Sequence, residues 1–127
     1  MRIKNRLNIA IVGLGNIGTY LYKYLQTNKV ILSKKNNCIP HVIYVSAKNI
    51  NKKRNVKISK NKWLKNYLDS TKLKNVDIIV ELIGGAEGPA KKLVFEALKN
   101  KKHVITANKA LIAKYGDKLS KIAEENK

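Results

Sequence analysis

The feature that most restricts the fold of this chain is a glycine-rich turn between an apolar run and an amphipathic run. Residues 7–12, LNIAIV, are predicted to form a buried strand, and GLGNIG follows directly at residues 13–18. Beyond the turn, apolar residues recur at helical spacing, at Ile17, Tyr20, Leu21, Tyr24 and Leu25. A strand that enters a helix through G-x-G-x-x-G is typical of the first unit of a parallel α/β sheet.

Strand and helix patterns alternate along the rest of the chain. Further strands are predicted at residues 39–45, 76–83 and 103–106, and helices from Pro89 onward and over residues 111–122. We also expect a short amphipathic helix over residues 60–70 and a break in the last helix at Gly116. Near-continuous apolar strands separated by helices indicate an α/β fold with a doubly wound parallel sheet, which is a Rossmann-like domain. The 127 residues suffice for one such domain.

Each glycine of the turn has a physical reason to be there. Gly13 permits the tight turn, Gly15 lets a pyrophosphate approach the backbone, and Gly18 lets the helix pack closely on the strand. The helix N-terminus offers free N–H groups and the positive end of its dipole to the phosphates. The turn therefore predicts an NAD(P) site, with a purely structural strand–helix turn as the alternative.

The residues after the second strand indicate which dinucleotide is preferred. An NAD site usually places an acidic residue about 20 residues after the turn, where it binds the ribose 2′-hydroxyl. This chain has no Asp or Glu before Asp69, and its second strand is followed by Lys48 and then by Lys52, Lys53 and Arg54. We therefore predict NADP(H), with NAD possible, and Lys48 and Arg54 as candidate 2′-phosphate ligands. In so lysine-rich a chain, the alternative is a lysine placed there by chance.

Ligands of open α/β sheets bind beyond the carboxyl ends of the strands. At the end of the third strand, Ile83, Gly84 and Gly85 are predicted to let backbone pass close to the nicotinamide half of the cofactor. After the fourth strand, Thr106, Asn108 and Lys109 are predicted to lie at the same edge. A lysine at that place would reach the junction between cofactor and substrate.

Other polar residues near the strands are interpreted as structural. Glu81 lies late in the third strand and is expected to be a partly buried structural carboxylate. His103 begins the fourth strand, and Cys38 lies by the start of the second, so both are distant from the predicted site. A single cysteine allows no disulfide within the chain, and a reducing cytoplasm is expected. We predict no metal site.

The strongly basic composition has two explanations. The net charge is +19, which normally indicates nucleic acid or an anionic surface as a partner. However, only three basic residues are arginine, and lysine, asparagine and isoleucine are together the residues that an AT-rich genome favours. We therefore predict no nucleic-acid site. The longest apolar runs are too short to span a bilayer, and no targeting segment or membrane association is predicted.

Two long strings carry a family resemblance. IAIVGLGNIG and VDIIVELIGGAEGPAKKLVFEALKNKKHVITANKALIAKYGDKL resemble the N-terminal nucleotide-binding part of homoserine dehydrogenase. The resemblance implies an NAD(P)-dependent oxidoreductase that interconverts L-homoserine and L-aspartate 4-semialdehyde, on the route to threonine, methionine and isoleucine. Both compounds would then be small-molecule substrates of the complete enzyme.

The resemblance also implies roles for particular residues. The TANK lysine, here Lys109, would lie at the nicotinamide and the substrate and act in cofactor binding and catalysis. Loop residues after the first glycine, here Leu14, Gly15, Asn16 and Ile17, would contact the pyrophosphate. The position after the second strand, usually arginine, is here Lys48, a departure that weakens bidentate phosphate binding.

The family's substrate-binding and dimerisation domain would follow this region and complete the active site. We therefore expect residues 1–127 to be a fragment that is incomplete at its C-terminal end, inactive alone, and a homo-oligomer only through the missing domain. The alternatives are another amino-acid or semialdehyde dehydrogenase, a non-catalytic NAD(P)-sensing regulatory module, and a nucleic-acid-binding protein suggested only by charge.

Overall fold

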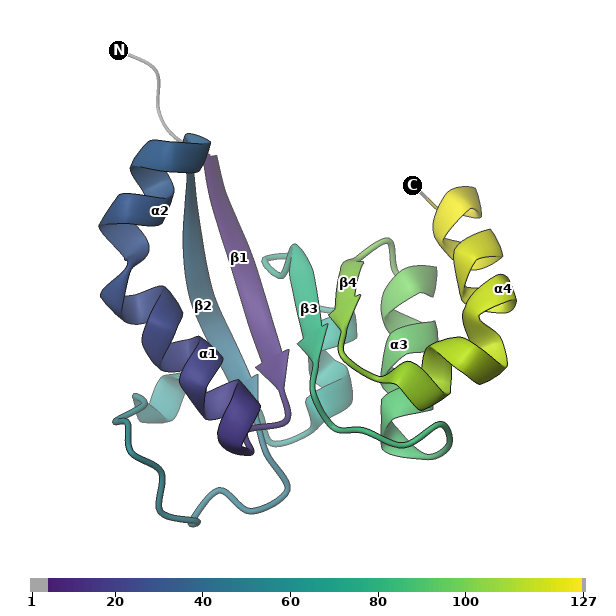
Figure 1. The fold of residues 1–127 in the computed structure, drawn as a ribbon, viewed down its shortest axis with the longest axis horizontal. Helices are drawn as coiled ribbons and strands as arrows, with labels where there is room; N and C mark the ends of the chain where they lie inside the picture. Colours follow the sequence, from purple (N-terminus) through teal and green to yellow (C-terminus); the bar gives the residue numbers. More distant parts are fainter. Residues whose placement is uncertain (1–4, 127) are drawn as a thin grey trace.

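The structure, a computed structural model, describes residues 5–126 and is built on a four-stranded sheet (Figure 1). The strands lie side by side in the order β2 (Cys38–Ser46), β1 (Asn5–Val12), β3 (Ile78–Glu81) and β4 (His103–Thr106). All three pairings are parallel. The predicted Rossmann-like α/β sheet is therefore confirmed.

Helices cover both faces of this sheet. The helices α1 (Asn16–Thr27) and α2 (Lys29–Asn36) lie along β1 and β2. The helix α3 (Pro89–Lys99) connects β3 to β4, and α4 (Lys109–Glu125) packs against α3. Pro89 occupies the first turn of α3, as predicted, where its missing N–H costs no helical hydrogen bond.

The apolar run of β1 is buried from both sides. Successive side chains of a strand point to opposite faces, so Ile11 packs with Tyr22 and Val45 on one face while Ala10 packs with Leu93 on the other. This explains why β1 reads as a continuous apolar run rather than as an alternating one.

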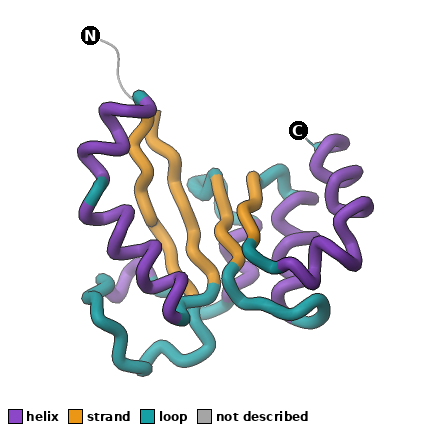
Figure 2. Tube along the Cα trace, viewed as in Figure 1, coloured by secondary structure: helices purple, strands orange, loops and turns teal. Residues whose placement is uncertain are grey.

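All four strands end at the same level of the sheet, since Ser46 of β2 is paired with Val12 of β1. Val12 of β1 is paired with Glu81 of β3, and Glu81 is paired with Thr106 of β4. The connections that leave these residues therefore begin at one edge of the sheet (Figure 2). Every segment predicted to bind the cofactor starts from this edge.

The prediction of one amphipathic helix over residues 60–70 is wrong. The segment contains two short 3₁₀ helices, Lys60–Lys62 and Tyr67–Thr71, with extended backbone at Trp63 between them. Trp63 forms an isolated parallel bridge with Val45 at the outer side of β2 and packs into the core there. The free edge of the sheet therefore decides the conformation, against the local helical pattern.

Two further differences concern helices. The helix α2 was not predicted, and its Val30 and Ile31 are exposed by 66% and 65%, so its apolar residues do not mark a buried face. The break expected at Gly116 is also wrong, because α4 continues through this residue. Figure 1 shows that α4 instead changes direction part of the way along.

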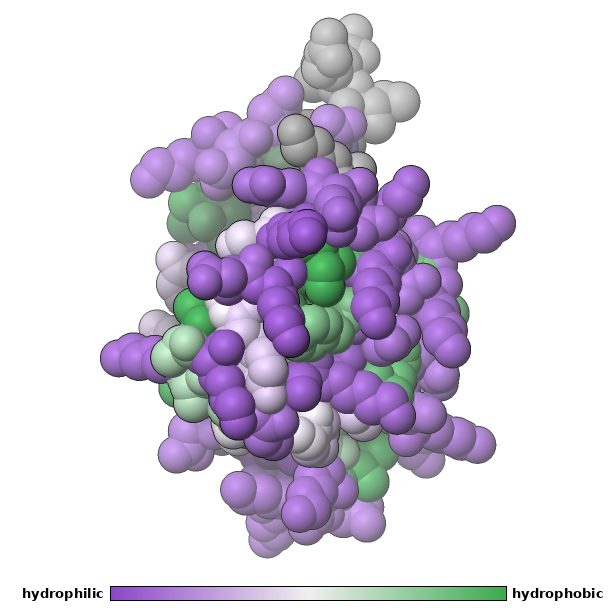
Figure 3. Space-filling model, turned by 90° about the vertical axis from the view of Figure 1, so that its right-hand side faces the viewer, coloured by the Kyte–Doolittle hydropathy of each residue, from purple (hydrophilic) through white to green (hydrophobic). Residues whose placement is uncertain are grey.

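The surface carries most of the excess positive charge. Within residues 5–126 only two ion pairs form, and Glu87 is the acid in both. The face seen in Figure 3 is mostly hydrophilic, with small apolar areas between the polar side chains. Among the described residues, no helix has the length and apolar character needed to cross a membrane.

Candidate functional site

The glycine turn after β1 is closely packed. Gly13 has a φ of +106°, and its N–H donates to the carbonyl of Ser46 at 2.9 Å. A Cβ at Gly13 would lie 2.6 Å from the carbonyl carbon of Leu82, which follows β3. Only glycine fits here, because both the backbone conformation and the contact exclude a side chain.

Gly18 and Gly15 differ in what surrounds them. A Cβ at Gly18 would lie 2.1 Å from the carbonyl oxygen of Gly13, which is the close packing predicted for this position. A Cβ at Gly15 would meet nothing within 4 Å. The helix α1 starts after Gly15 with no side-chain cap and no acidic residue in its first turn. Its first N–H groups therefore have no side-chain acceptor, and the helix start favours an anion.

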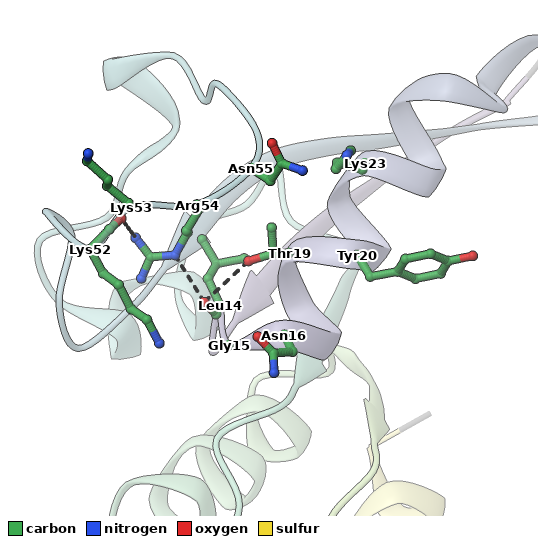
Figure 4. Close-up of a pocket in the computed structure, with 10 residues that line it drawn as sticks. All are labelled: Leu14, Gly15, Asn16, Thr19, Tyr20, Lys23, Lys52, Lys53, Arg54 and Asn55. Atoms are coloured by element: carbon green, nitrogen blue, oxygen red, sulfur yellow. Dashed lines mark hydrogen bonds between the residues drawn. The ribbon is translucent and has the colours of Figure 1, made fainter.

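A pocket of about 280 Å³ lies beside this helix start (Figure 4). One wall comes from the glycine turn and α1, the other from residues 52–55. The lining residues are Leu14, Gly15, Asn16, Thr19, Tyr20, Lys23, Lys52, Lys53, Arg54 and Asn55. Because four of them are basic and none is acidic, the pocket suits a phosphate-bearing ligand.

Arg54 holds the two walls of this pocket together. Its Nε donates to the carbonyl of Leu14 at 3.0 Å, and its terminal nitrogens donate to carbonyls of the loop before it, the shortest being 2.8 Å to Asn49. The guanidinium also lies over the ring of Trp63, 5.4 Å from its centroid. In this conformation most Arg54 donors serve the loop, so its main contribution is structural.

The other predicted phosphate ligand lies elsewhere. Lys48 is exposed and is absent from the pocket lining. Lys52 and Lys53 are exposed lining residues, and sequence reasoning did not single them out. Ile17 lies in the first turn of α1 with 67% of its surface exposed.

The end of β3 carries a buried carboxylate. Glu81 has no exposed surface, and its Oε2 accepts hydrogen bonds from the N–H groups of Ile83 at 2.8 Å and Gly84 at 3.0 Å. Its Oε1 accepts a hydrogen bond from the Thr106 hydroxyl. Gly84 and Gly85 have φ values of +91° and +84°, a backbone conformation that favours glycine.

Asn108 organises the end of β4. Its Oδ1 accepts from the N–H of Leu111 at 3.0 Å and caps α4, while its Nδ2 donates to the carbonyl of Gly85 at 2.6 Å. Its backbone N–H donates to the Thr106 hydroxyl at 3.0 Å. Lys109 is the next residue, exposed at the start of α4. Asparagine is among the residues preferred at helix N-caps, so this role of Asn108 has a signal in the sequence.

A charged cluster fastens the loop after Gly85 to α4. Glu87 accepts a hydrogen bond from the Tyr115 hydroxyl and pairs with Lys114 at 2.7 Å. The hydrogen bonds from Lys114 and Tyr115 lower the pKa of Glu87 from 4.5 to about 2. A hydrogen bond with Tyr115 also raises the pKa of Lys91, which lies 3.4 Å from Glu87.

The structure thus gathers the predicted residues on loops that leave one sheet edge. A parallel α/β sheet with a tight glycine turn, an uncapped helix start and a basic pocket defines a dinucleotide-binding domain. Residues 13–127 match the family model described as homoserine dehydrogenase, NAD binding domain. The chain belongs to this family.

Named relatives support this assignment. A homoserine dehydrogenase of Bacillus subtilis is 35% identical over 120 residues, which are 94% of this chain and 28% of the relative. A crystal structure of the S. aureus homoserine dehydrogenase has a TM-score of 0.84 and 37% identity, covering 95% of this chain and 30% of that one. The Thiobacillus denitrificans enzyme gives a TM-score of 0.87 and 31% identity, over 98% and 29%. The chain thus spans less than a third of these relatives.

The glycine turn gives a contrast between two substitutions. We expect Gly18→Ala to destabilise the fold by about 1–3 kcal/mol, because its methyl group collides with backbone that cannot move aside. Gly15→Ala should leave the midpoint of thermal unfolding nearly unchanged, because its methyl group enters open space. Circular dichroism melts of both variants test this. Equal melting temperatures for the two variants would contradict the close packing at Gly18.

The Glu87 cluster gives a pH dependence. Because the folded-state pKa is lowered to about 2, the cluster contributes stability fully above the unfolded-state pKa and loses it as the pH falls toward 2. An NMR titration of the Glu87 side-chain carboxyl should therefore show a midpoint near 2. Lys114→Met should move that midpoint upward, toward 4.5. A wild-type midpoint already at 4.5 would show that the cluster does not form in solution.

Proposed function

We propose that this chain is the NADP(H)-binding domain of a homoserine dehydrogenase, which transfers a hydride between NADP(H) and L-homoserine or L-aspartate 4-semialdehyde. The observation that carries the proposal is the uncapped start of α1 beside open space at Gly15 and a basic pocket. The family of the chain supports the same activity. The complete enzyme would act in the synthesis of threonine, methionine and isoleucine in the cytoplasm.

The geometry around α1 fits the phosphates of such a cofactor. The backbone of residues 14–17 supplies N–H groups for the pyrophosphate, and a Gly15 side chain would occupy space that this group needs. Lys52 and Lys53 are exposed residues of the pocket lining and would pair with a 2′-phosphate. Arg54 would orient their loop, and Lys48 would contribute from outside the pocket.

The ends of β3 and β4 would hold the nicotinamide half. Ile83, Gly84 and Gly85 would pass along the ring, while Thr106, Asn108 and Lys109 would face it from the neighbouring loop. The cofactor, when bound, supplies the hydride acceptor for alcohol oxidation. Negative charge then develops on the substrate oxygen as its proton leaves, and the Lys109 ammonium would stabilise that oxygen or relay the proton.

Catalysis would need the substrate-binding and dimerisation domain that the family resemblance implies. Homo-oligomer formation would also depend on that domain. We therefore expect residues 1–127 to bind the cofactor but to show negligible turnover of L-homoserine on their own.

Cofactor preference can be measured on the chain itself. Isothermal titration should show NADP⁺ bound at least tenfold tighter than NAD⁺, which corresponds to about 1.4 kcal/mol. Lys52→Ala with Lys53→Ala should remove most of this difference. The matched control, Lys118→Ala with Lys121→Ala, deletes the same charge from exposed positions of α4 and should keep it. Equal affinities for NAD⁺ and NADP⁺ in the wild-type chain would refute the preference.

The role of Lys109 requires a complete active site. In a chimera of this chain with the following domain of the Bacillus subtilis relative, Lys109→Ala should lower kcat for L-homoserine oxidation by about 10²-fold or more. Lys118→Ala, a remote substitution on the same helix, should have little effect. If turnover and cofactor affinity were both unchanged in the Lys109 variant, the assignment would be rejected.

A further inference from the structure

We propose that Glu81 is a positioning residue that sets the two loops of the nicotinamide half relative to each other, acting through Thr106 and Asn108. The proposal rests on the proposed cofactor site and extends it to a side chain that touches neither cofactor nor substrate. Glu81 itself lies inside the sheet, with no exposed surface.

The burial of this carboxylate indicates a specific structural role. A buried carboxylate is costly unless donors satisfy it, and an apolar residue at the end of a buried strand avoids that cost. Glu81 receives three donors, namely the N–H groups of Ile83 and Gly84 and the hydroxyl of Thr106. Two of these lie on the loop after β3 and one at the end of β4, so the carboxylate joins both.

The hydrogen bonds close into a ring. The Thr106 hydroxyl has one proton and donates it to Glu81, so the same oxygen can accept from the N–H of Asn108. The Asn108 side chain then donates to the carbonyl of Gly85, which returns the ring to the loop after β3. Each hydrogen bond has a fixed direction, and no member can be replaced by an apolar side chain without opening the ring.

Few other contacts set the distance between these loops. The ladder between β3 and β4 ends at Glu81 and Thr106, and the next backbone contact, from Ala107 to the Glu81 carbonyl, is 3.5 Å long. Gly84 and Gly85 are exposed and have no side chains to anchor them. The Glu87 cluster holds the loop further on, and Gly13 packs on it at Leu82, so between these two points the placement of Gly84 and Gly85 against the loop of Lys109 depends on Glu81 and Asn108.

Glu81→Gln reverses the direction of one bond in the ring with almost no change of volume and leaves the Thr106 proton without its acceptor. The amide oxygen can still accept from Ile83 and Gly84, but the amide NH₂ then faces Thr106 as a donor. The Thr106 oxygen has two lone pairs and can accept from this amide as well as from Asn108, but its own proton loses the carboxylate that accepted it. The predicted effect is a loss of order between the two loops while the rest of the domain is retained.

The test compares two ligands on the 127-residue chain. NADPH contains the nicotinamide half, and 2′,5′-ADP lacks it, so only NADPH reports on these loops. Glu81→Gln should weaken NADPH binding about tenfold and reduce the fluorescence change of the bound nicotinamide, while the affinity for 2′,5′-ADP stays within about twofold of wild type. Glu124→Gln makes the same charge change at an exposed position of α4 and should alter neither ligand.

Thr106→Val gives an independent reading, because it removes the hydroxyl and keeps the shape of the side chain. Thr106→Val should reproduce the selective loss of NADPH affinity. This test remains valid even if circular dichroism shows that Glu81→Gln is unfolded. The double variant should bind NADPH no more weakly than the weaker-binding single variant, since both changes disrupt the same ring of hydrogen bonds.

The outcomes separate the two proposals. Equal weakening of NADPH and 2′,5′-ADP in folded variants, or no weakening of either, would overturn the positioning role while leaving the cofactor site intact. Additive effects of the two substitutions would also overturn it. A wild-type chain that binds neither ligand would reject the proposed function itself, and the positioning role with it.

Discussion

The contact between Gly13 and the backbone at Leu82 is the constraint on which the rest of the site depends. It brings the end of β1 against the chain that leaves β3, at a separation that excludes any side chain on Gly13. Gly18 then packs against Gly13 itself, which sets the start of α1. The start of α1 and the start of the loop after β3 are thus placed by two successive contacts of bare backbone.

The site also depends on a separation of charges. The surface is dominated by lysine. Glu81, at the carboxyl end of β3, is by contrast the single fully buried carboxylate among the described residues. Exposed lysines are solvated and tolerate variation, so most of them define no structure. The buried acid is satisfied entirely by neutral donors, and this makes its surroundings sensitive to small changes.

Much of the fold could be predicted from the sequence because the strands and the glycine turn have strong local signals. The central strand β1 is apolar on both faces, and the spacing of Gly13, Gly15 and Gly18 between strand and helix is a local signal, although the contact that requires glycine at position 13 is with Leu82, far along the chain. The helix predicted around Trp63 is wrong because the conformation of this segment is decided by its pairing with the edge of β2, which is distant in sequence. The sequence of α2 does not show the apolar spacing that predicts a buried helix face, since Val30 and Ile31 are exposed.

The site itself was only partly predictable, for a related reason. The order of strands along the chain predicted that Lys109, Asn108 and the glycines after β3 lie at one edge of the sheet, but it could not show what Arg54 would contact. In the folded chain the Arg54 guanidinium reaches back across many residues to the carbonyl of Leu14. The ring through Glu81 likewise joins three segments that only the register of β3 and β4 brings together.

The arrangement around Arg54 has a consequence for how such a domain can change over evolution. Arg54 is committed to carbonyls of its own loop and of the glycine turn, whereas Lys52 and Lys53 present exposed charges to the same pocket. Mutation can therefore alter the charge of the pocket at the lysines without disturbing its walls. Scaffold and charge are encoded by neighbouring but separate positions, so ligand preference can drift while the architecture is conserved.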